Sequence, residues 1–293
     1  MSKQSLLGKV AIITGGGGGM GSVMALAMME EGAGVTIVDI RQDRLNATAK
    51  KAASVGGEGS MLPHCADITR AEDCNGVVET VVSKFGNVHI LLNNAGVGMQ
   101  TVRPDYMREP VRFWEVEPDR WQALMDVNWK GAFLMARVVA PHLIRQGWGR
   151  IINVTTSLDT MYRPGYTPYG MSKAALEAAT ASWAKDLEKT GVTVNVLVPG
   201  GPTNTSFIPD GAPFDRSTLV QPDVMAAPVC WLASNASDGI TGCRFVANLW
   251  DSKIPPDEAA KKACAPAAWQ GIASLAAWPE NPAGLAAKKE RGS

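Results

Sequence analysis

The chain is poor in the features that define several classes of protein. Its cysteines are odd in number and scattered along 293 residues: Cys65, Cys74, Cys230, Cys243 and Cys264. They have neither the close pairing of a zinc site nor the density of a disulfide-linked domain. The three histidines also stand apart, without the spacing of metal ligands. The sequence therefore predicts no metal site and no disulfide framework, and it favours a cytoplasmic location.

Net charge and long hydrophobic runs are missing as well. The 28 lysines and arginines balance 28 aspartates and glutamates, so no overall field would attract nucleic acid or an anionic membrane. The first apolar run begins at Val10, and glycines end it directly after Thr14. Such a run is too short for a signal peptide or a membrane span. We expect a chain that is neither exported nor anchored to a membrane and that binds no nucleic acid.

Short apolar runs alternate with longer stretches of helical composition. The runs that predict β-strands are residues 10–14, 35–39, 59–67, 89–94, 150–155, 192–198 and 244–247. Continuous apolar strands joined by connections long enough for helices indicate a parallel sheet covered on both faces. Because such connections are right-handed, the expected fold is a doubly wound, Rossmann-like α/β sheet of seven strands.

A single domain is expected to hold this sheet, because α/β folds often reach this length as one unit. We predict that domain over residues 1–250. Residues 251–293 are richer in alanine, lysine and proline, and we expect a C-terminal extension that packs on the domain or on a neighbouring subunit. Residues 99–118 carry three prolines and three arginines and predict an irregular excursion rather than a helix.

A glycine-rich turn follows the first predicted strand. The segment TGGGGGMG, residues 14–21, leads into a stretch of helical composition. Glycine lets the backbone turn tightly and approach a pyrophosphate, whose charge is met by the free amides and the positive dipole end of the helix. The run of five glycines is compatible with two different dinucleotide-binding motifs. Gly15, Gly19 and Gly21 match one dinucleotide-binding motif, and Gly15, Gly18 and Gly21 match another.

The second predicted strand ends in Asp39, about 20 residues beyond the glycines, where a carboxylate can accept hydrogen bonds from the adenosine ribose hydroxyls. The same charge would repel a 2′-phosphate. The glycine loop also lacks a lysine or arginine that would neutralise such a phosphate. Two features therefore favour NAD over NADP, and Arg41 is the nearby cation that leaves NADP as an alternative.

Three further motifs complete a known pattern. NNAG lies at residues 93–96, VNWKG surrounds Asn128, and YGMSK runs from Tyr169 to Lys173. With these motifs the sequence resembles the short-chain dehydrogenase/reductase family over about residues 9–246. The Tyr-x-x-x-Lys motif just after the fifth strand is typical of the short, single-domain branch. That resemblance favours the glycine motif with residues 15, 19 and 21, and it implies a hydride-transferring oxidoreductase.

The resemblance also assigns contacts with a cofactor and with other subunits. It implies that the residues bordering the cofactor are Gly15, Gly19, Met20, Gly21, Asp39, Asp67, Ile68, Asn94, Ala95, Gly96, Tyr169, Lys173, Pro199, Gly200 and Thr203. Within this set Asp67 and Ile68 flank the adenine, and Pro199 and Gly200 border the nicotinamide. Members of the family commonly pair the tyrosine-bearing helix across a dimer, so a homodimer or homotetramer is implied.

Tyr169 and Lys173 also make chemical sense without the family. Four residues apart on a helix, they lie on one face, so the ammonium can sit near the phenol oxygen. A unit charge at about 4 Å with an effective dielectric near 20 contributes roughly 4 kcal/mol. That interaction would lower a tyrosine pKa from near 10 toward about 7. A phenol with such a pKa suits general acid and base catalysis at neutral pH.

Two positions depart from the family pattern. The family has serine thirteen residues before the tyrosine, whereas this chain has Thr156 there, followed by Ser157. Threonine keeps a hydroxyl that can donate to a substrate oxygen. If the fifth strand continues that far, alternation points Ser157 to the opposite face, and an earlier turn would favour Ser157 instead. The threonine that faces the carboxamide is likewise either Thr203 or Thr205.

Together these features predict an NAD-dependent oxidoreductase that moves a hydride between nicotinamide and a secondary alcohol or ketone. The catalytic residues would be Asn128, Thr156 or Ser157, Tyr169 and Lys173, and the resemblance gives Asn128 the task of fixing a water. The rival hypothesis is a dinucleotide-binding sensor or scaffold that has lost turnover, which only the threonine at 156 favours. An epimerase of the extended branch would need a larger C-terminal domain. The residues do not define the substrate itself.

Overall fold

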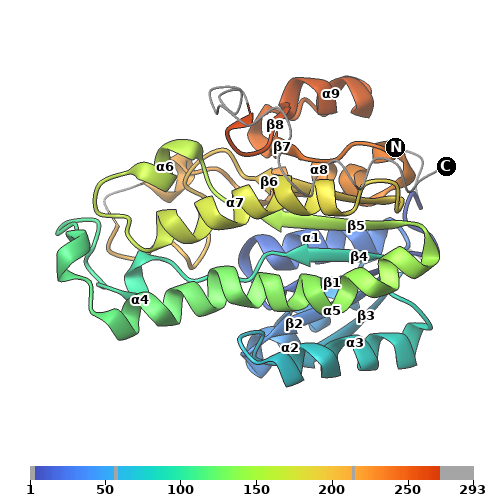
Figure 1. The fold of residues 1–293 in the computed structure, drawn as a ribbon, viewed down its shortest axis with the longest axis horizontal. Helices are drawn as coiled ribbons and strands as arrows, with labels where there is room; N and C mark the ends of the chain where they lie inside the picture. The colour runs from blue at the N-terminus through green and yellow to red at the C-terminus, as the bar shows by residue number, and fades with distance from the viewer. Residues whose placement is uncertain (1–3, 56–58, 213–214, 271–293) are drawn as a thin grey trace, which may run out of the picture.

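A central β-sheet with helices on both faces forms the fold (Figure 1). The computed structural model describes residues 4–55, 59–212 and 215–270. Its strands are β1 Val10–Thr14, β2 Gly34–Asp39, β3 Ser60–Cys65, β4 Ile90–Asn93, β5 Gly149–Val154, β6 Val192–Val198, β7 Cys243–Val246 and β8 Cys264–Pro266. They lie side by side in the order β3-β2-β1-β4-β5-β6-β7-β8. All neighbours from β3 to β7 are parallel, which confirms the predicted doubly wound α/β fold.

The helices of the described residues cover the two faces of the sheet. They are α1 Gly19–Glu30, α2 Gln42–Ala52, α3 Ala71–Phe85, α4 Pro118–Met125, α5 Gly131–Gln146, α6 Leu158–Tyr162, α7 Tyr169–Asp186, α8 Ala226–Ala233 and α9 Pro256–Ala263. One core cluster joins α1 and α8 to the sheet, and a second joins α3, α5 and α7 to its other face. No helix in the described part of the chain is long and apolar enough to span a membrane.

Strand β1 shows why the apolar runs are continuous. Ala11 and Ile13 are buried in the cluster with α1, whereas Val10 and Ile12 are buried in the cluster with α3 and α5. Side chains of a strand alternate between the two faces of a sheet. Because both faces of this sheet are covered, every position of the strand is apolar or buried.

The sheet has eight strands rather than the seven predicted. Strand β8 lies in the C-terminal extension and pairs antiparallel with β7, with Cys243 opposite Pro266 and Phe245 opposite Cys264. The sequence CAP carries no β-branched or aromatic residue, so pattern analysis has nothing to detect. A proline fits this position because β8 is the edge of the sheet. Residues 271–293 of the predicted extension lie outside the described residues.

The strand order creates one reversal point. From β1 the chain adds β2 and then β3 toward one edge of the sheet. It then crosses back, and β4 pairs with the opposite edge of β1. Loops leaving β1 and β4 therefore diverge, and the crevice between them lies at the carboxyl ends of the strands. Ligands of open α/β sheets bind at such a crevice.

Candidate active site

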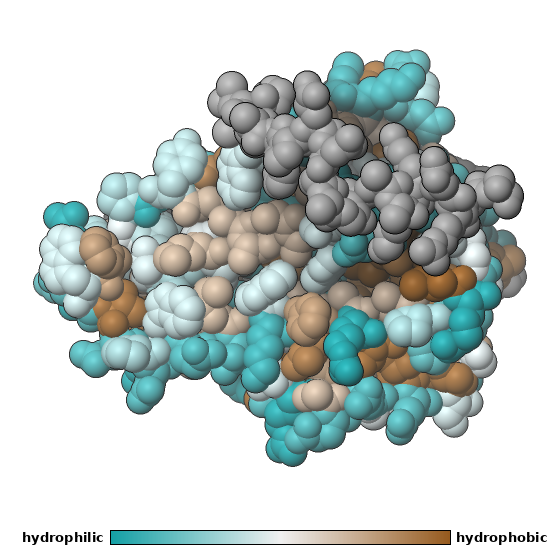
Figure 2. All heavy atoms as spheres, in the orientation of Figure 1, coloured by the Kyte–Doolittle hydropathy of each residue, from teal (hydrophilic) through white to brown (hydrophobic). Residues whose placement is uncertain are grey.

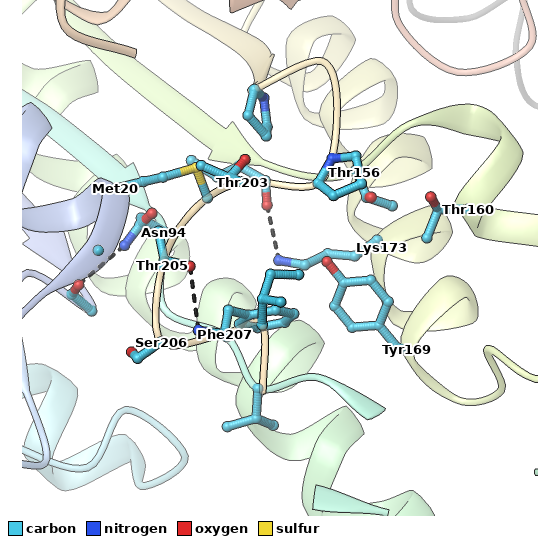
Figure 3. A pocket seen from close by; sticks show the side chains of 18 of the residues that line it. Met20, Asn94, Thr156, Thr160, Tyr169, Lys173, Thr203, Thr205, Ser206 and Phe207 are labelled. Atoms are coloured by element: carbon cyan, nitrogen blue, oxygen red, sulfur yellow. Dashed lines mark hydrogen bonds between the residues drawn. The ribbon is translucent and has the colours of Figure 1, made fainter. Parts of the chain in front are cut away.

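A cavity of about 470 Å³ opens at the carboxyl ends of the parallel strands. Its walls come from the loops after β1, β4, β5 and β6, from the end of β2, and from the start of α7. Figure 3 shows Thr156, Tyr169 and Lys173 on one side of this cavity and Met20 and Asn94 on the other. The parallel sheet thus brings the two ends of the predicted site together.

The glycine loop contacts other backbone where a side chain would not fit. Gly15 has a φ of +65°, and a Cβ atom there would lie 2.8 Å from the Cα atom of Ala95. A Cβ atom on Gly21 would lie 2.2 Å from the carbonyl oxygen of Gly15, and Gly19 has a left-handed φ of +52°. Gly18 is extended, and a Cβ atom there would have nothing within 4 Å. The geometry therefore favours the motif formed by Gly15, Gly19 and Gly21.

Asn94 fastens this loop to the end of β4. Its Nδ2 donates to the carbonyl oxygens of Thr14, at 3.0 Å, and Gly15, at 3.1 Å. The Oγ1 of Thr14 accepts the backbone N–H groups of Asn94 at 3.0 Å and Ala95 at 3.1 Å. Asn94, Ala95 and Gly96 also border the cavity. The motif after β4 therefore both lines the site and holds the glycine loop in shape.

Asp39 ends β2 and borders the cavity. Its carboxylate accepts the backbone N–H groups of Gly17, at 3.3 Å, and Arg41, at 3.0 Å. The Arg41 side chain pairs with Asp43 at 2.7 Å and does not line the cavity. Arg44, on α2, does line it. Sequence analysis missed this cation because it lies inside the next helix rather than in the glycine loop.

Asp67 and Ile68 follow β3 and do not border the cavity. The Oδ1 of Asp67 accepts the backbone N–H of Thr69 at 2.9 Å and its hydroxyl at 2.8 Å. The strand end before them is tied to β2, since the N–H of Ala66 donates to the carbonyl oxygen of Asp39 at 3.1 Å. Their assignment to the adenine stays a prediction.

Asn128 is fully buried in a π-helical turn, Asp126–Lys130, between α4 and α5. Its Oδ1 accepts the N–H of Val97 at 2.8 Å, and its Nδ2 donates to the Val97 carbonyl at 2.9 Å and to Ser172 Oγ at 3.0 Å. The side chain joins the segment after β4 to α7, next to Lys173. It does not border the cavity, and its part in holding a water stays a prediction.

Tyr169 and Lys173 lie one turn apart at the start of α7, and both border the cavity. Lys173 Nζ donates to the carbonyl oxygen of Val154 at 2.9 Å, and burial lowers the lysine pKa to about 8. Burial raises the pKa of Tyr169 to about 12, opposed by a hydrogen bond with the Thr156 side chain. Without a cofactor the pKa of Tyr169 therefore rises instead of falling toward 7, because burial disfavours the phenolate.

Thr156 and Ser157 follow β5 rather than lying on it, since the strand ends at Val154. The strand does not continue as far as Ser157, so alternation along β5 does not decide which hydroxyl faces the cavity. Ser157 caps α6, where its Oγ accepts the N–H of Thr160 at 3.3 Å and lies 2.6 Å from the Thr160 hydroxyl. The Thr156 side chain is instead near enough to Tyr169 to lower the pKa of the phenol, against the larger upward effect of burial. Both residues border the cavity, but the Ser157 hydroxyl is already engaged with Thr160 in the helix cap.

The loop after β6 forms another wall, with Pro199, Gly200, Thr203 and Thr205. Gly200 has a φ of +97°, which favours glycine. Thr203 donates its hydroxyl to the Gly201 carbonyl at 3.1 Å, whereas Thr205 Oγ1 accepts the Phe207 N–H at 3.3 Å. The two threonines thus present different hydrogen-bonding groups to a ligand.

Aromatic side chains line the end of the cavity around Tyr169. Tyr106 comes from the excursion before α4, Tyr166 precedes α7, and Phe207 follows β6. The rings of Tyr106 and Tyr166 meet edge to face at 5.9 Å, and the Phe207 ring lies 5.6 Å from that of Tyr169. Tyr106 and Tyr166 were not predicted at the site, because only folding brings their segments together, whereas the apolar composition of residues 206–220 favours a substrate-covering segment that includes Phe207. The unusual length of the excursion was the one available signal for Tyr106.

The cavity suits an extended dinucleotide. The glycine loop leads into the N-terminus of α1, and its backbone fills the space that side chains would occupy. A carboxylate stands at the ribose end, and hydroxyl and ammonium groups stand at the other end. Within the described residues, no group of three or more histidine, cysteine or acidic side chains is arranged to hold a metal ion.

The family profile described as "short chain dehydrogenase" matches residues 9–209. The chain therefore belongs to the short-chain dehydrogenase family, whose members are oxidoreductases that bind a nicotinamide dinucleotide.

Individual relatives agree with this assignment. The chain is 33% identical over 248 residues to the 3-oxoacyl-(acyl-carrier-protein) reductase FabG of Thermotoga maritima, covering 81% of this chain and 95% of that one. It is 30% identical over 245 residues to 2,5-dichloro-2,5-cyclohexadiene-1,4-diol dehydrogenase LinX of Sphingobium indicum, covering 81% and 93%. A solved short-chain type dehydrogenase/reductase from Mycobacterium marinum superposes with a TM-score of 0.71 at 28% identity, covering 82% and 94%.

Substituting alanine at two glycines tests the geometry of the loop. Gly21→Ala should lower the free energy of unfolding by about 2 kcal/mol or more, because its Cβ would collide with backbone. Gly18→Ala should change it by less than about 0.5 kcal/mol, because the site is open and extended. Urea denaturation of both variants measures the difference. Equal losses of unfolding free energy in the two variants would contradict the motif with Gly15, Gly19 and Gly21.

Proposed function

We propose that this protein is an NAD-dependent oxidoreductase that interconverts a secondary alcohol and a ketone. The observation that carries the proposal is one cavity bordered by the glycine loop, by Asp39, and by Thr156, Tyr169 and Lys173. When bound, nicotinamide supplies the hydride acceptor or donor. The protein's own residues would bind the cofactor and the substrate, orient them, and transfer the proton of the substrate hydroxyl.

Tyr169 would exchange a proton with the substrate oxygen. Its pKa of about 12 keeps the phenol protonated at neutral pH, which suits donation to a carbonyl oxygen. In the opposite direction the phenolate needs positive charge nearby, and Lys173 remains mostly protonated at pH 7 because its pKa is about 8. Thr156 would hold the substrate oxygen beside the phenol.

The substrate end of the cavity favours an uncharged, apolar alcohol or ketone. Tyr106, Met107, Tyr166 and Phe207 border it, and the arginine in this wall, Arg163, forms an ion pair with Asp159. An apolar wall gains most from burying a hydrocarbon or aromatic substituent. The two relatives named above act on dissimilar substrates by their names, so the wall supports this class more directly than either relative does.

NAD is the proposed cofactor because Asp39 borders the cavity and accepts hydrogen bonds where the adenosine ribose is expected. A 2′-phosphate there would meet a carboxylate. Arg44 also borders the cavity and would partly offset that repulsion, so we expect a preference rather than exclusion of NADP.

A homodimer or homotetramer in the cytoplasm is part of the proposal. Figure 2 shows pale to brown residues over α7, with fewer of the teal residues that follow the lower edge of the molecule. Phe133 and Ile144 on α5 and Met171 on α7 are each more than two-fifths exposed. Such side chains gain free energy when a partner covers them. The five cysteines are free thiols, as suits a reducing compartment.

Tyr169→Phe tests the proposed chemistry. It removes the acid and base hydroxyl with little change in volume, so turnover should fall by at least roughly 10²-fold while cofactor affinity is nearly kept. Tyr162→Phe is the matched control, since that ring is 76% exposed. Nicotinamide absorbance is followed over a panel of secondary alcohols and ketones. Cofactor binding without turnover by the unaltered protein would favour the sensor or scaffold instead.

The roles of the Thr156 and Ser157 hydroxyls can be distinguished by measuring both the catalytic rate and the stability of their variants. Thr156→Val should lower kcat by about 10²- to 10³-fold, whereas Thr156→Ser should stay active because it keeps the hydroxyl. Ser157→Ala should keep its rate but lose about 1 kcal/mol of unfolding free energy, because it removes a helix cap. An active Thr156→Val enzyme with an inactive Ser157→Ala enzyme would move the substrate contact to Ser157.

Cofactor preference is tested by the dissociation constants of NAD and NADP, measured by titration calorimetry at one salt concentration. NAD should bind more tightly, and Asp39→Ala should narrow the gap. Arg44→Ala should weaken NADP more than NAD, whereas Arg41→Ala should change neither, because its side chain pairs with Asp43. Tighter binding of NADP by the unaltered protein would refute the assignment.

A further inference from the structure

A buried ion pair lies behind the cavity, between α7 and β7. Nη1 of Arg244 lies 2.7 Å from Oε2 of Glu177, and the two side chains are 7% and 0% exposed. Neither residue borders the cavity. Removing two charges from water is unfavourable, and such a pair is weak evidence for stability on its own. Its hydrogen bonds indicate a different role.

The pair holds the two residues that follow β5. Thr155 Oγ1 donates to Glu177 Oε2 at 2.8 Å, and Arg244 Nη1 lies 3.4 Å from the same hydroxyl oxygen. Arg244 Nη2 donates to the carbonyl oxygen of Thr156 at 2.5 Å. The pairing of β5 with β6 ends at Val154, so no sheet hydrogen bond sets the backbone at 155 and 156. Instead the guanidinium holds the backbone carbonyl of Thr156, and the carboxylate holds the side-chain hydroxyl of Thr155.

The C-terminal extension completes this arrangement. The second oxygen of Glu177, Oε1, accepts the N–H of Ala268 at 3.2 Å. Ala267 is fully buried, and its N–H donates to the Gly242 carbonyl at 2.9 Å. Strand β8 pairs Ala265 with Arg244. The chain beyond β7 therefore covers the ion pair, and its backbone donates a hydrogen bond to the second carboxylate oxygen of Glu177.

We propose that Arg244 and Glu177 are positioning residues for the active site, which hold Thr156 so that its hydroxyl meets Tyr169 and the substrate. The extension through Ala268 belongs to the same support. This inference rests on the function proposed above. Arg244 acts through Thr156 because its bond goes to the backbone carbonyl of that residue, which borders the cavity together with Tyr169. A lysine has a single ammonium and cannot span the carboxylate and the carbonyl as a guanidinium does.

The test replaces both charges together, Arg244→Met with Glu177→Leu, because apolar replacement of a whole buried pair is tolerated where removal of one partner is not. The double variant should fold and bind cofactor normally, with kcat lower by roughly 10- to 100-fold and KM little changed, because Thr156 is misplaced. Arg150→Met is the matched control, since it removes a buried arginine at the other end of β5. It should lower stability and leave kcat unchanged.

Coupling to Thr156 distinguishes positioning from general support. In the background of Thr156→Ala the double replacement should cost less than about twofold in kcat, because the hydroxyl it positions is already gone. Independent, multiplying losses would overturn the inference. So would unchanged kcat in the double variant, or equal loss in Arg150→Met.

A readout without turnover separates this inference from the proposed function. With 13Cζ-labelled tyrosine the protein gives one signal for each of four tyrosines, and Tyr169→Phe assigns the signal of Tyr169. The double replacement should shift that signal, and Arg150→Met should not. A shifted signal in a protein that never turns over would refute the function and keep the positioning. An unshifted signal would refute the positioning even in an active enzyme.

Discussion

Close contact between two backbone segments, at the carboxyl ends of β1 and β4, shapes the site. The missing side chain of Gly15 lets the glycine loop lie against Ala95, and Gly21 packs against the Gly15 carbonyl. Asn94 then ties the two segments together with hydrogen bonds to Thr14 and Gly15. Because β1 and β4 are neighbours at the reversal point of the sheet, this contact places the glycine loop and Tyr169 at the same cavity.

At the end of the cavity that holds Tyr169 and Lys173, burial disfavours the charged form of both side chains. Burial raises the pKa of Tyr169 and lowers that of Lys173, so each group is driven toward its neutral form. The carbonyl of Val154 supplies the hydrogen bond that the buried ammonium of Lys173 needs. The phenol of Tyr169 is therefore protonated at neutral pH, and a positively charged ligand nearby would favour its ionisation.

Sequence pattern predicted the fold well because a sheet buried on both faces needs continuous apolar strands, and seven such runs are visible. It failed at β8, whose three residues pair only because β7 offers an edge. It also left open whether the fifth strand continues past Thr156, whereas β5 ends at Val154. The tyrosine pKa was misjudged because spacing along a helix gives the distance between two groups but not the burial around them. Arg44 and Tyr166 were missed for the same reason, since nothing local marks a residue that only folding brings to the cavity.

The sequence by itself determined the class of the protein. A strand, a glycine turn and a helix, followed by NNAG and Tyr-x-x-x-Lys, are local patterns whose chemistry is written in neighbouring residues. Tertiary structure alone decided which glycines require their lack of a side chain, that the Ser157 hydroxyl caps a helix, and that Glu177 and Arg244 form an ion pair behind the cavity. Such contacts join residues far apart in the chain, and their energies depend on burial and on distance, which no local pattern records.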